Sequence, residues 1–232
     1  MTITKVVCNR FRNLHAVEIE PAAGLNILCG DNAQGKTNLM EAIWLFTGAR
    51  SFRAGSDAGM IEFGEETASV EVAFVAGDRE QTASIRLGPG KRASRNGIDL
   101  VSVTELAGTF PCVVFSPSHL SLVKDGPEVR RRFLDTLLGQ VSPRMIPLLQ
   151  DYRKTVAQRT ALVRDIPKHS ELLDMLPVYD EMVARQGGRI AKARAELVKR
   201  LARSAKEYYD EISGGRETLS ISLKTSFMAL PE

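Results

Sequence analysis

The eight residues Gly30-Asp31-Asn32-Ala33-Gln34-Gly35-Lys36-Thr37 fit the pattern G-x-x-x-x-G-K-[ST] at every fixed position. A short apolar run at residues 25–29 precedes them and predicts a buried strand, and apolar residues at helical spacing follow them and predict a helix. A chance match in a glycine-containing turn is the alternative. Four fixed positions between a strand and a helix disfavour that alternative.

The residue types in this segment suit a loop that wraps a triphosphate. Small side chains let the backbone approach closely, successive N–H groups form an anion-binding concavity, and the next helix adds its positive end. Lys36 is expected to reach the β- and γ-phosphates, and the Thr37 hydroxyl to ligate Mg²⁺. Since the sequence contains no N-K-x-D guanine-reading box, the expected cofactors are ATP and Mg²⁺, held by residues 30–37.

The sequence offers less for hydrolysis than for binding. P-loop enzymes use a carboxylate at a strand end to organise Mg²⁺ and water. The best candidate, residues 112–115 within the apolar strand predicted at residues 110–115, runs instead into Ser116-Pro117. No Ser-His-Asp, HExxH or paired-carboxylate pattern occurs. We therefore predict a chain that binds ATP, hydrolyses it poorly and holds no catalytic residue of its own.

Composition sets the class of protein. The chain has 232 residues, of which 44% are hydrophobic and 25% charged, so it can bury a core and is not dominated by disorder. No apolar run reaches the roughly 18 residues of a membrane span, and the charged N-terminal residues do not resemble a signal peptide. The cysteines, Cys8, Cys29 and Cys112, lack metal or disulfide spacing, which favours the cytoplasm.

The chain changes character along its length. Residues 1–125 are expected to form a strand-rich, ATP-binding lobe, and residues 126–212 a basic helical arm. Residues 213–232 are expected to return to the lobe as a strand, because residues 218–227 alternate between apolar and polar. Residues 127–209 hold 17 Lys and Arg against 10 Asp and Glu, while the remainder holds 14 against 18. This surplus indicates either a polyanion contact or a solvated helical face.

Four segments closely resemble the RecF family of bacterial recombination mediators: residues 11–14, 30–43, 48–53 and 121–135. The resemblance extends over essentially the whole chain. It implies an α/β fold, namely the P-loop head lobe of an ABC-type, SMC-like ATPase, with a mixed sheet, a P-loop helix and an inserted helical arm. The Walker B carboxylates, ABC signature motif and D-loop of the family lie further along, so the C-terminal part of the head is expected to be missing. Ser118-His119 replaces an acidic pair that is usual in the family.

The resemblance also implies a function in recombinational DNA repair, replication restart and the SOS response to DNA damage. It implies weak, DNA-stimulated ATPase activity, an ATP-dependent homodimer, binding to DNA gaps or junctions, and RecO and RecR as partners. Arg12 and Asn13 would then lie beside the nucleotide; an ordinary turn at a strand edge is the alternative. A non-catalytic P-loop interaction module and a self-contained P-loop kinase are the rival functions.

Residues of the arm that could contact DNA phosphates are basic and lie in predicted helices. The alternative for them is a solvated helical face with a structural ion pair, for instance to Asp135. The candidates are Arg130, Arg131, Arg189, Lys192, Lys199 and Arg200.

Overall fold

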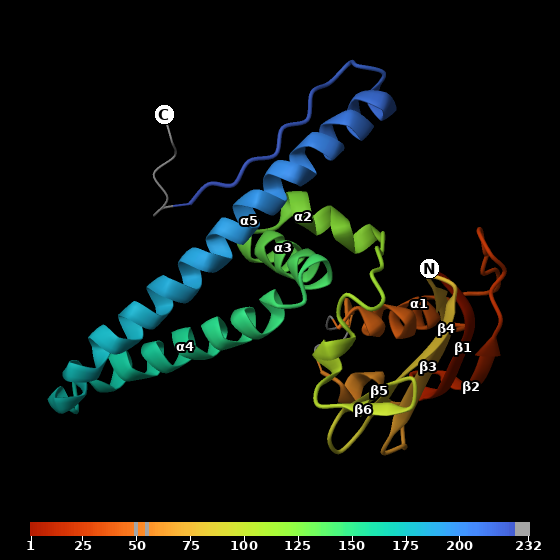
Figure 1. Ribbon diagram of the computed structural model, residues 1–232, viewed down its shortest axis with the longest axis horizontal. Coiled ribbons are helices and arrows are strands. Elements are labelled where there is room, and N and C mark those ends of the chain that lie inside the picture. Colours follow the sequence, from red (N-terminus) through yellow and green to blue (C-terminus); the bar gives the residue numbers. More distant parts are fainter. Residues whose placement is uncertain (49–50, 54–55, 226–232) are drawn as a thin grey trace. The chain divides into compact units, whose positions relative to one another are not determined.

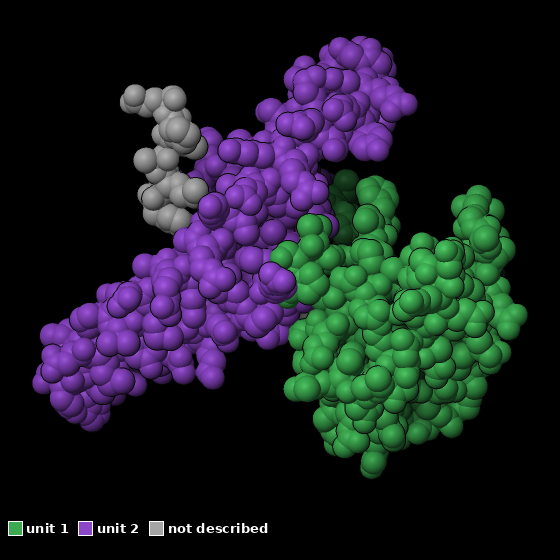
Figure 2. Space-filling model, in the orientation of Figure 1, with its two compact units in different colours: residues 1–120, 139–143 green, residues 121–138, 144–232 purple. Residues whose placement is uncertain are grey.

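The computed structural model describes residues 1–48, 51–53 and 56–225 of the chain, which forms two compact units (Figures 1 and 2). Unit 1 comprises residues 1–120 and 139–143, and unit 2 comprises residues 121–138 and 144–232. The first division falls at residue 120, close to the boundary that the sequence predicts at residue 125.

Unit 1 contains a six-stranded sheet with the order β2-β1-β3-β4-β5-β6. Every pair of neighbouring strands is antiparallel, so the expected mixed sheet is antiparallel throughout the part of the chain that the structure describes. The strands are β1 (Thr2–Phe11), β2 (Leu14–Ile19), β3 (Ala68–Ala76), β4 (Arg79–Leu87), β5 (Arg92–Arg95) and β6 (Ile98–Leu100).

Two tight turns, at a Gly-Asp pair and at an Asn-Gly pair, join neighbouring strands of the sheet. Gly77 and Asp78 join β3 to β4 with φ values of 53° and 56°, and Ala76 pairs with Arg79 across the turn. Residues 96–97, the Asn-Gly pair, join β5 to β6 with φ values of 51° and 77°. Positive φ at both central residues is the type I′ geometry, whose twist matches that of the flanking strands.

The core of unit 1 lies between one face of this sheet and the helix that follows the phosphate loop (Figure 1). This helix, α1 (Lys36–Trp44), continues into the short 3₁₀ helix η1 (Leu45–Thr47). Alternate residues of the strands point into the core, and Leu39, Ala42 and Phe46 pack against them from the helical side. Burial of that helical stripe fixes α1 on the sheet and thereby places its N-terminus, where the phosphate loop ends.

The apolar run before the phosphate loop does not form the buried strand that the sequence predicts. Residues 25–29 are extended but belong to no strand, and the side chains of Leu25 and Ile27 are 86% and 74% exposed. Cys29 is exposed as well. Among the described residues no strand pairs with this run, and an apolar sequence becomes a strand only where a neighbour accepts its backbone hydrogen bonds.

Two further predicted strands are not formed by the residues that the structure describes. Within residues 110–115 only Phe110 is buried, while Val113 and Phe115 are 87% and 92% exposed. Residues 218–225 form no strand and cluster with unit 2 rather than with the lobe; residues 226–232 lie outside the described part of the chain. The expected return of a strand to the lobe is therefore not seen in the residues described.

Unit 2 is built from helices, and its two longest, α4 and α5, pack side by side (Figure 1). Its helices are α2 (Ser121–Lys124), α3 (Pro127–Val141), α4 (Met145–Asp165) and α5 (Leu176–Ser213). The short 3₁₀ helices are η2 (Ala58–Met60), η3 (Val103–Leu106) and η4 (Pro117–Leu120) in unit 1 and η5 (Ser170–Met175) in unit 2. Within the described residues no helix is both long enough and apolar enough to cross a membrane.

The last part of the predicted helical arm is one long helix, α5, which runs through Gly187 and Gly188 without a break. Glycine weakens a helix, so this pair made one continuous helix uncertain from the sequence. Tyr152 of α4 explains Gly187: a Cβ atom there would lie 3.3 Å from the ring atom Cε2 of Tyr152. The missing side chain thus lets α4 approach α5 closely.

Candidate functional site

The phosphate loop, residues 30–37, turns tightly at the N-terminus of α1. Three of its residues, Gly30, Ala33 and Gly35, have positive φ values of 140°, 66° and 96°. A backbone in which residues of left-handed and right-handed conformation alternate directs successive N–H groups into one anion-binding concavity. Residues 30–34 are exposed, so a phosphate group can reach them from solvent.

Gly35 is required at its position for two reasons. Its φ of 96° lies in the left-handed region that favours glycine. A Cβ atom on Gly35 would also lie 2.6 Å from Cδ2 of Leu14 and 2.9 Å from Oδ1 of Asn13. The second fixed glycine of the motif therefore reflects close packing of the loop against the turn between β1 and β2.

Lys36, the invariant cation of the motif, folds back onto its own loop. Its Nζ donates hydrogen bonds of 2.6 Å to the carbonyl oxygens of Gly30 and Asp31. These acceptors hold the ammonium group over the concavity, where a phosphate oxygen could replace them. Thr37 follows in the first turn of α1 and is exposed, as a hydroxyl ligand for Mg²⁺ must be.

Asn13, which we expected beside the nucleotide, contacts the phosphate loop. Its Nδ2 donates to the carbonyl oxygen of Ala33 at 2.7 Å, and its Oδ1 accepts from Nδ2 of Asn38 at 2.7 Å. Asn38 in turn accepts from Nη1 of Arg53 at 2.6 Å. A chain of hydrogen bonds therefore connects the apex of the loop to α1 and to the segment beyond η1.

Arg12 lies in the same turn but its side chain is directed to Glu41 of α1. Nε and Nη2 of Arg12 donate to the two oxygens of Glu41 at 2.6 and 2.9 Å, and the Ser51 hydroxyl donates to the same carboxylate. Glu41 is completely buried. Sequence reasoning missed it, because Glu41 lies about 200° around the helix from Leu39 and a carboxylate is rarely buried, although Leu45 one turn later on the same face is buried.

Among the basic candidates of unit 2, one makes hydrogen bonds within the protein and the other five are exposed. Arg130 donates through Nη1 to the carbonyl oxygens of Leu122 and Asp125, at 3.0 and 2.8 Å, so it fastens the end of α2. Arg131 is exposed on α3. The other four candidates are exposed on α5 and fall within about 100° of its circumference at 3.6 residues per turn. We call this set the α5 basic surface: Arg189, Lys192, Lys199 and Arg200.

The ion pair that we considered between Asp135 and the arginines at the start of α3 is not formed. Asp135 is 9% exposed and accepts from Arg194 at 2.7 Å and from Arg153 at 3.1 Å, which ties α3 to α4 and α5. Arg132 pairs instead with Glu128 one helical turn away, at 2.9 Å. Asp135 is therefore structural, and it keeps Arg194 out of the exposed basic set.

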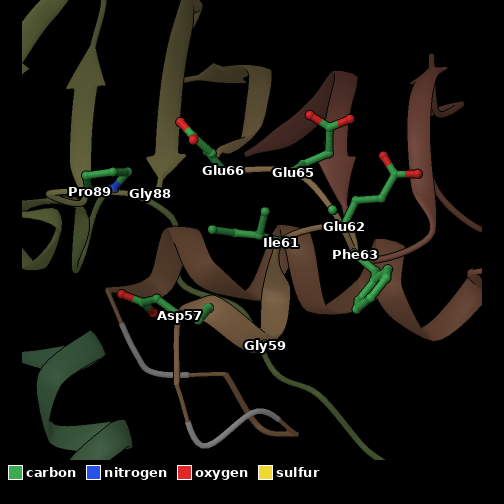
Figure 3. Close-up of a pocket in the computed structure, with 11 residues that line it drawn as sticks. Asp57, Gly59, Ile61, Glu62, Phe63, Glu65, Glu66, Gly88 and Pro89 are labelled. Carbon is green, nitrogen blue, oxygen red and sulfur yellow. The ribbon is translucent and has the colours of Figure 1, made fainter.

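A separate concavity of about 600 Å³ lies in unit 1 and is lined mainly by residues 57–66 (Figure 3). Four carboxylates line it: Asp57, Glu62, Glu65 and Glu66. Burial raises the pKa of Glu62, but hydrogen bonds from Arg10 and His15 outweigh this and lower the pKa overall. No residue of the phosphate loop lines this concavity, and its negative charge repels phosphates. It is not a substrate pocket beside the phosphate loop.

The residue pair 118–119, which replaces the acidic pair usual in the family, ends with His119. Nδ1 of His119 accepts from the backbone N–H of Ser116 at 3.0 Å, and its ring stacks on Phe115. These contacts give His119 a local structural role. In the described part of the chain no group of three or more His, Cys, Asp or Glu residues could hold a metal ion.

Comparison with known proteins places these features in a family. The sequence pattern of the AAA domain family matches residues 5–212. The chain belongs to the AAA domain family. The match includes the phosphate loop, α1 and nearly all of α5.

Curated relatives of this AAA domain chain are named DNA replication and repair protein RecF, so the expected resemblance is confirmed. The relative from Agathobacter rectalis is 35% identical over 228 residues, which are 97% of this chain and 63% of the relative. The relative from Synechococcus sp. is 38% identical over 219 residues, covering 92% of this chain and 57% of the relative. The chain thus spans about three fifths of the length of the relatives it matches.

Solved structures confirm the fold of an ATPase head. A structure described as the recombination mediator protein RecF-ATP in the RecFOR pathway matches with a TM-score of 0.87 and 33% identity, covering 92% of this chain and 58% of that chain. An Smc head domain from Pyrococcus furiosus, at 16% identity and a TM-score of 0.50, shares the fold alone. The expected α/β head lobe with a helical arm is confirmed.

Proposed function

We propose that this chain binds ATP through residues 30–37 and acts in DNA replication and repair. The observation that carries the proposal is the backbone of the phosphate loop, which the turn between β1 and β2 holds in an anion-binding conformation. The match to a structure described as RecF-ATP supports ATP as the ligand.

The residues of the loop fit this nucleotide with Mg²⁺. Lys36 exchanges the carbonyl oxygens of Gly30 and Asp31 for β- and γ-phosphate oxygens, which it binds more strongly because they carry charge. The exposed Thr37 hydroxyl would ligate Mg²⁺, which neutralises phosphate charge when bound. Backbone N–H groups of the loop and the N-terminus of α1 orient the triphosphate. Asn13 supports the loop through Ala33.

We further propose that unit 2 contacts DNA through the α5 basic surface and Arg131, with preference for gaps or junctions. In this proposal ATP promotes formation of a homodimer, and the partners of the protein are RecO and RecR. The protein works in the cytoplasm, during recombinational repair, replication restart and the SOS response to DNA damage. The names of the relatives and of the matched RecF structure support this context. Four cations on one exposed helical face can neutralise several phosphates together.

The kinase alternative finds little support in the described residues. A phosphoacceptor must sit within about 3.5 Å of the γ-phosphate, but the concavity at residues 57–66 is acidic and contains no phosphate-loop residue. The alternative of a non-catalytic P-loop interaction module is separated from our proposal by ATP turnover. Turnover stimulated by gapped DNA supports the proposal, while binding without turnover supports the module.

Isothermal titration of ATP and Mg²⁺ into wild-type protein and Lys36→Ala tests the proposed site. Wild type should bind ATP, and Lys36→Ala should lose at least tenfold in affinity, because a charged hydrogen bond contributes about 1.5–3 kcal/mol. Lys154→Ala, which removes an exposed lysine of α4, is the matched control and should bind as wild type does. Equal affinity in Lys36→Ala and wild type would contradict the proposal.

A further inference from the structure

Glu41 is a charged side chain in a place where charge is costly. It is 0% exposed, in the middle of α1, and both of its carboxylate oxygens accept hydrogen bonds. It lies about 200° around the helix from Leu39 but on the same face as Leu45, one turn later, which is buried as well. A buried carboxylate persists where its partners are well placed, and here the main partner is Arg12.

The partner comes from the turn that touches the phosphate loop. Arg12 has a φ of 54°, in the left-handed region, and its backbone N–H donates to the carbonyl oxygen of Met60 at 2.9 Å. Its guanidinium group is held by two hydrogen bonds to Glu41. Arg12 is therefore fixed through both its backbone and its side chain, in a conformation that few residues adopt unaided.

Fixing Arg12 fixes the next residue. The side chain of Asn13 donates to Ala33 at the apex of the phosphate loop and accepts from Asn38 of α1. Its Oδ1 also lies 2.9 Å from the point where a Cβ atom of Gly35 would stand. A small rotation of this turn would therefore displace Asn13 from the loop or press it against Gly35.

We propose that Glu41 is a positioning residue for the nucleotide: acting through Arg12, it orients Asn13 so that the phosphate loop is held in its binding conformation before ATP arrives. The inference rests on the proposed function. Holding a loop in its bound conformation raises affinity because less ordering remains to be done on binding. In this arrangement Arg12 supports the site from behind, and its guanidinium group does not contact the phosphates.

A double-mutant cycle on ATP affinity tests the proposal. Glu41→Gln, Asn13→Ala and the double variant are titrated with ATP and Mg²⁺ below the unfolding temperature of each, which is measured separately. We expect about a tenfold loss for each single variant and no further loss in the double variant, because Glu41 acts through Asn13. Glu196→Gln, an exposed glutamate of α5, is the control and should leave the affinity unchanged.

The cycle separates positioning from a merely structural role. A structural role lowers the unfolding temperature of Glu41→Gln but leaves ATP affinity intact in the folded protein, and this outcome would overturn the proposal. Losses that multiply to about a hundredfold in the double variant would overturn it as well. If Glu41→Gln does not fold, Arg12→Lys replaces it in the same cycle, because lysine keeps the charge and loses the paired hydrogen bonds.

The proposed function and this inference fail in different measurements. Wild-type protein that takes up no ATP would refute the proposed function, and the inference with it. Wild-type protein that binds ATP, with Glu41→Gln binding equally well, would refute the inference alone.

Discussion

Replacing Gly35 by alanine should damage the phosphate loop in a way that the structure allows us to estimate. Alanine at a φ of 96° costs about 1–2 kcal/mol, because its Cβ atom crowds the following carbonyl group. The same Cβ atom would lie 2.6 Å from Leu14 and 2.9 Å from Asn13, and relieving such overpacking costs a further ~1–3 kcal/mol. The flexible end of the Leu14 side chain can move, so we expect a total near the lower end of the sum, about 2–3 kcal/mol.

The single tryptophan of the chain makes this effect measurable in unit 1. Trp44 is the last residue of α1, so its fluorescence during urea denaturation follows the lobe that carries the phosphate loop. Gly35→Ala should lower the urea midpoint of this signal and weaken ATP binding. Gly188→Ala is the matched control: apart from the adjacent backbone of α5, no described atom lies within 4 Å of its added Cβ, and alanine should stabilise α5 by about 0.5–1 kcal/mol.

Two outcomes would refute this reasoning. A Gly35→Ala protein whose free energy of unfolding stays within about 0.5 kcal/mol of wild type, the ordinary range for surface changes, would show that the loop accommodates the side chain. Destabilisation of the tryptophan signal by Gly188→Ala would show that the signal does not report on unit 1.

The remaining predictions concern DNA and the cysteines. Replacing all four residues of the α5 basic surface by alanine should weaken binding to gapped DNA. The slope of log binding constant against log salt concentration should become shallower by up to about 3.6, at roughly 0.9 per phosphate contact. Fluorescence anisotropy at several salt concentrations measures this slope, and an unchanged slope would exclude this surface as the DNA contact. Exposed Cys29 should react quickly with a thiol reagent, while Cys8 should resist it, because burial raises the pKa of Cys8 to about 12 and withholds the reactive thiolate. Counting modified cysteines over time, with and without urea, checks this, and rapid labelling of native Cys8 would contradict the packing of β1.

The sequence predicts the parts of this protein that local chemistry determines. The phosphate loop, the helix after it and the turns at residues 77–78 and 96–97 follow from fixed glycines and short-range spacing, and the structure contains them. The long helix α5 was predictable for the same reason, although Gly187 made its continuity uncertain until Tyr152 showed why a glycine stands there.

Features that depend on a distant partner were not predictable. An apolar run such as residues 25–29 shows a preference for burial, but the neighbour that would complete a strand is not encoded in the run. Glu41 was missed for a related reason: its burial depends on Arg12, 29 positions earlier in the chain. Likewise, the periodicity of α5 does not reveal that Arg194 is engaged by Asp135, 59 positions away.

The strand order also bears on how the protein is made. From β3 to β6 each strand pairs with the next one along the chain, and among the strands that the structure describes only the pairing of β1 with β3 joins strands that are not consecutive. Short-range pairings form quickly because little chain must be closed into a loop. This meander can therefore assemble on the ribosome while the helices of unit 2 are still being synthesised, and the sheet against which α1 packs is in place early in biosynthesis.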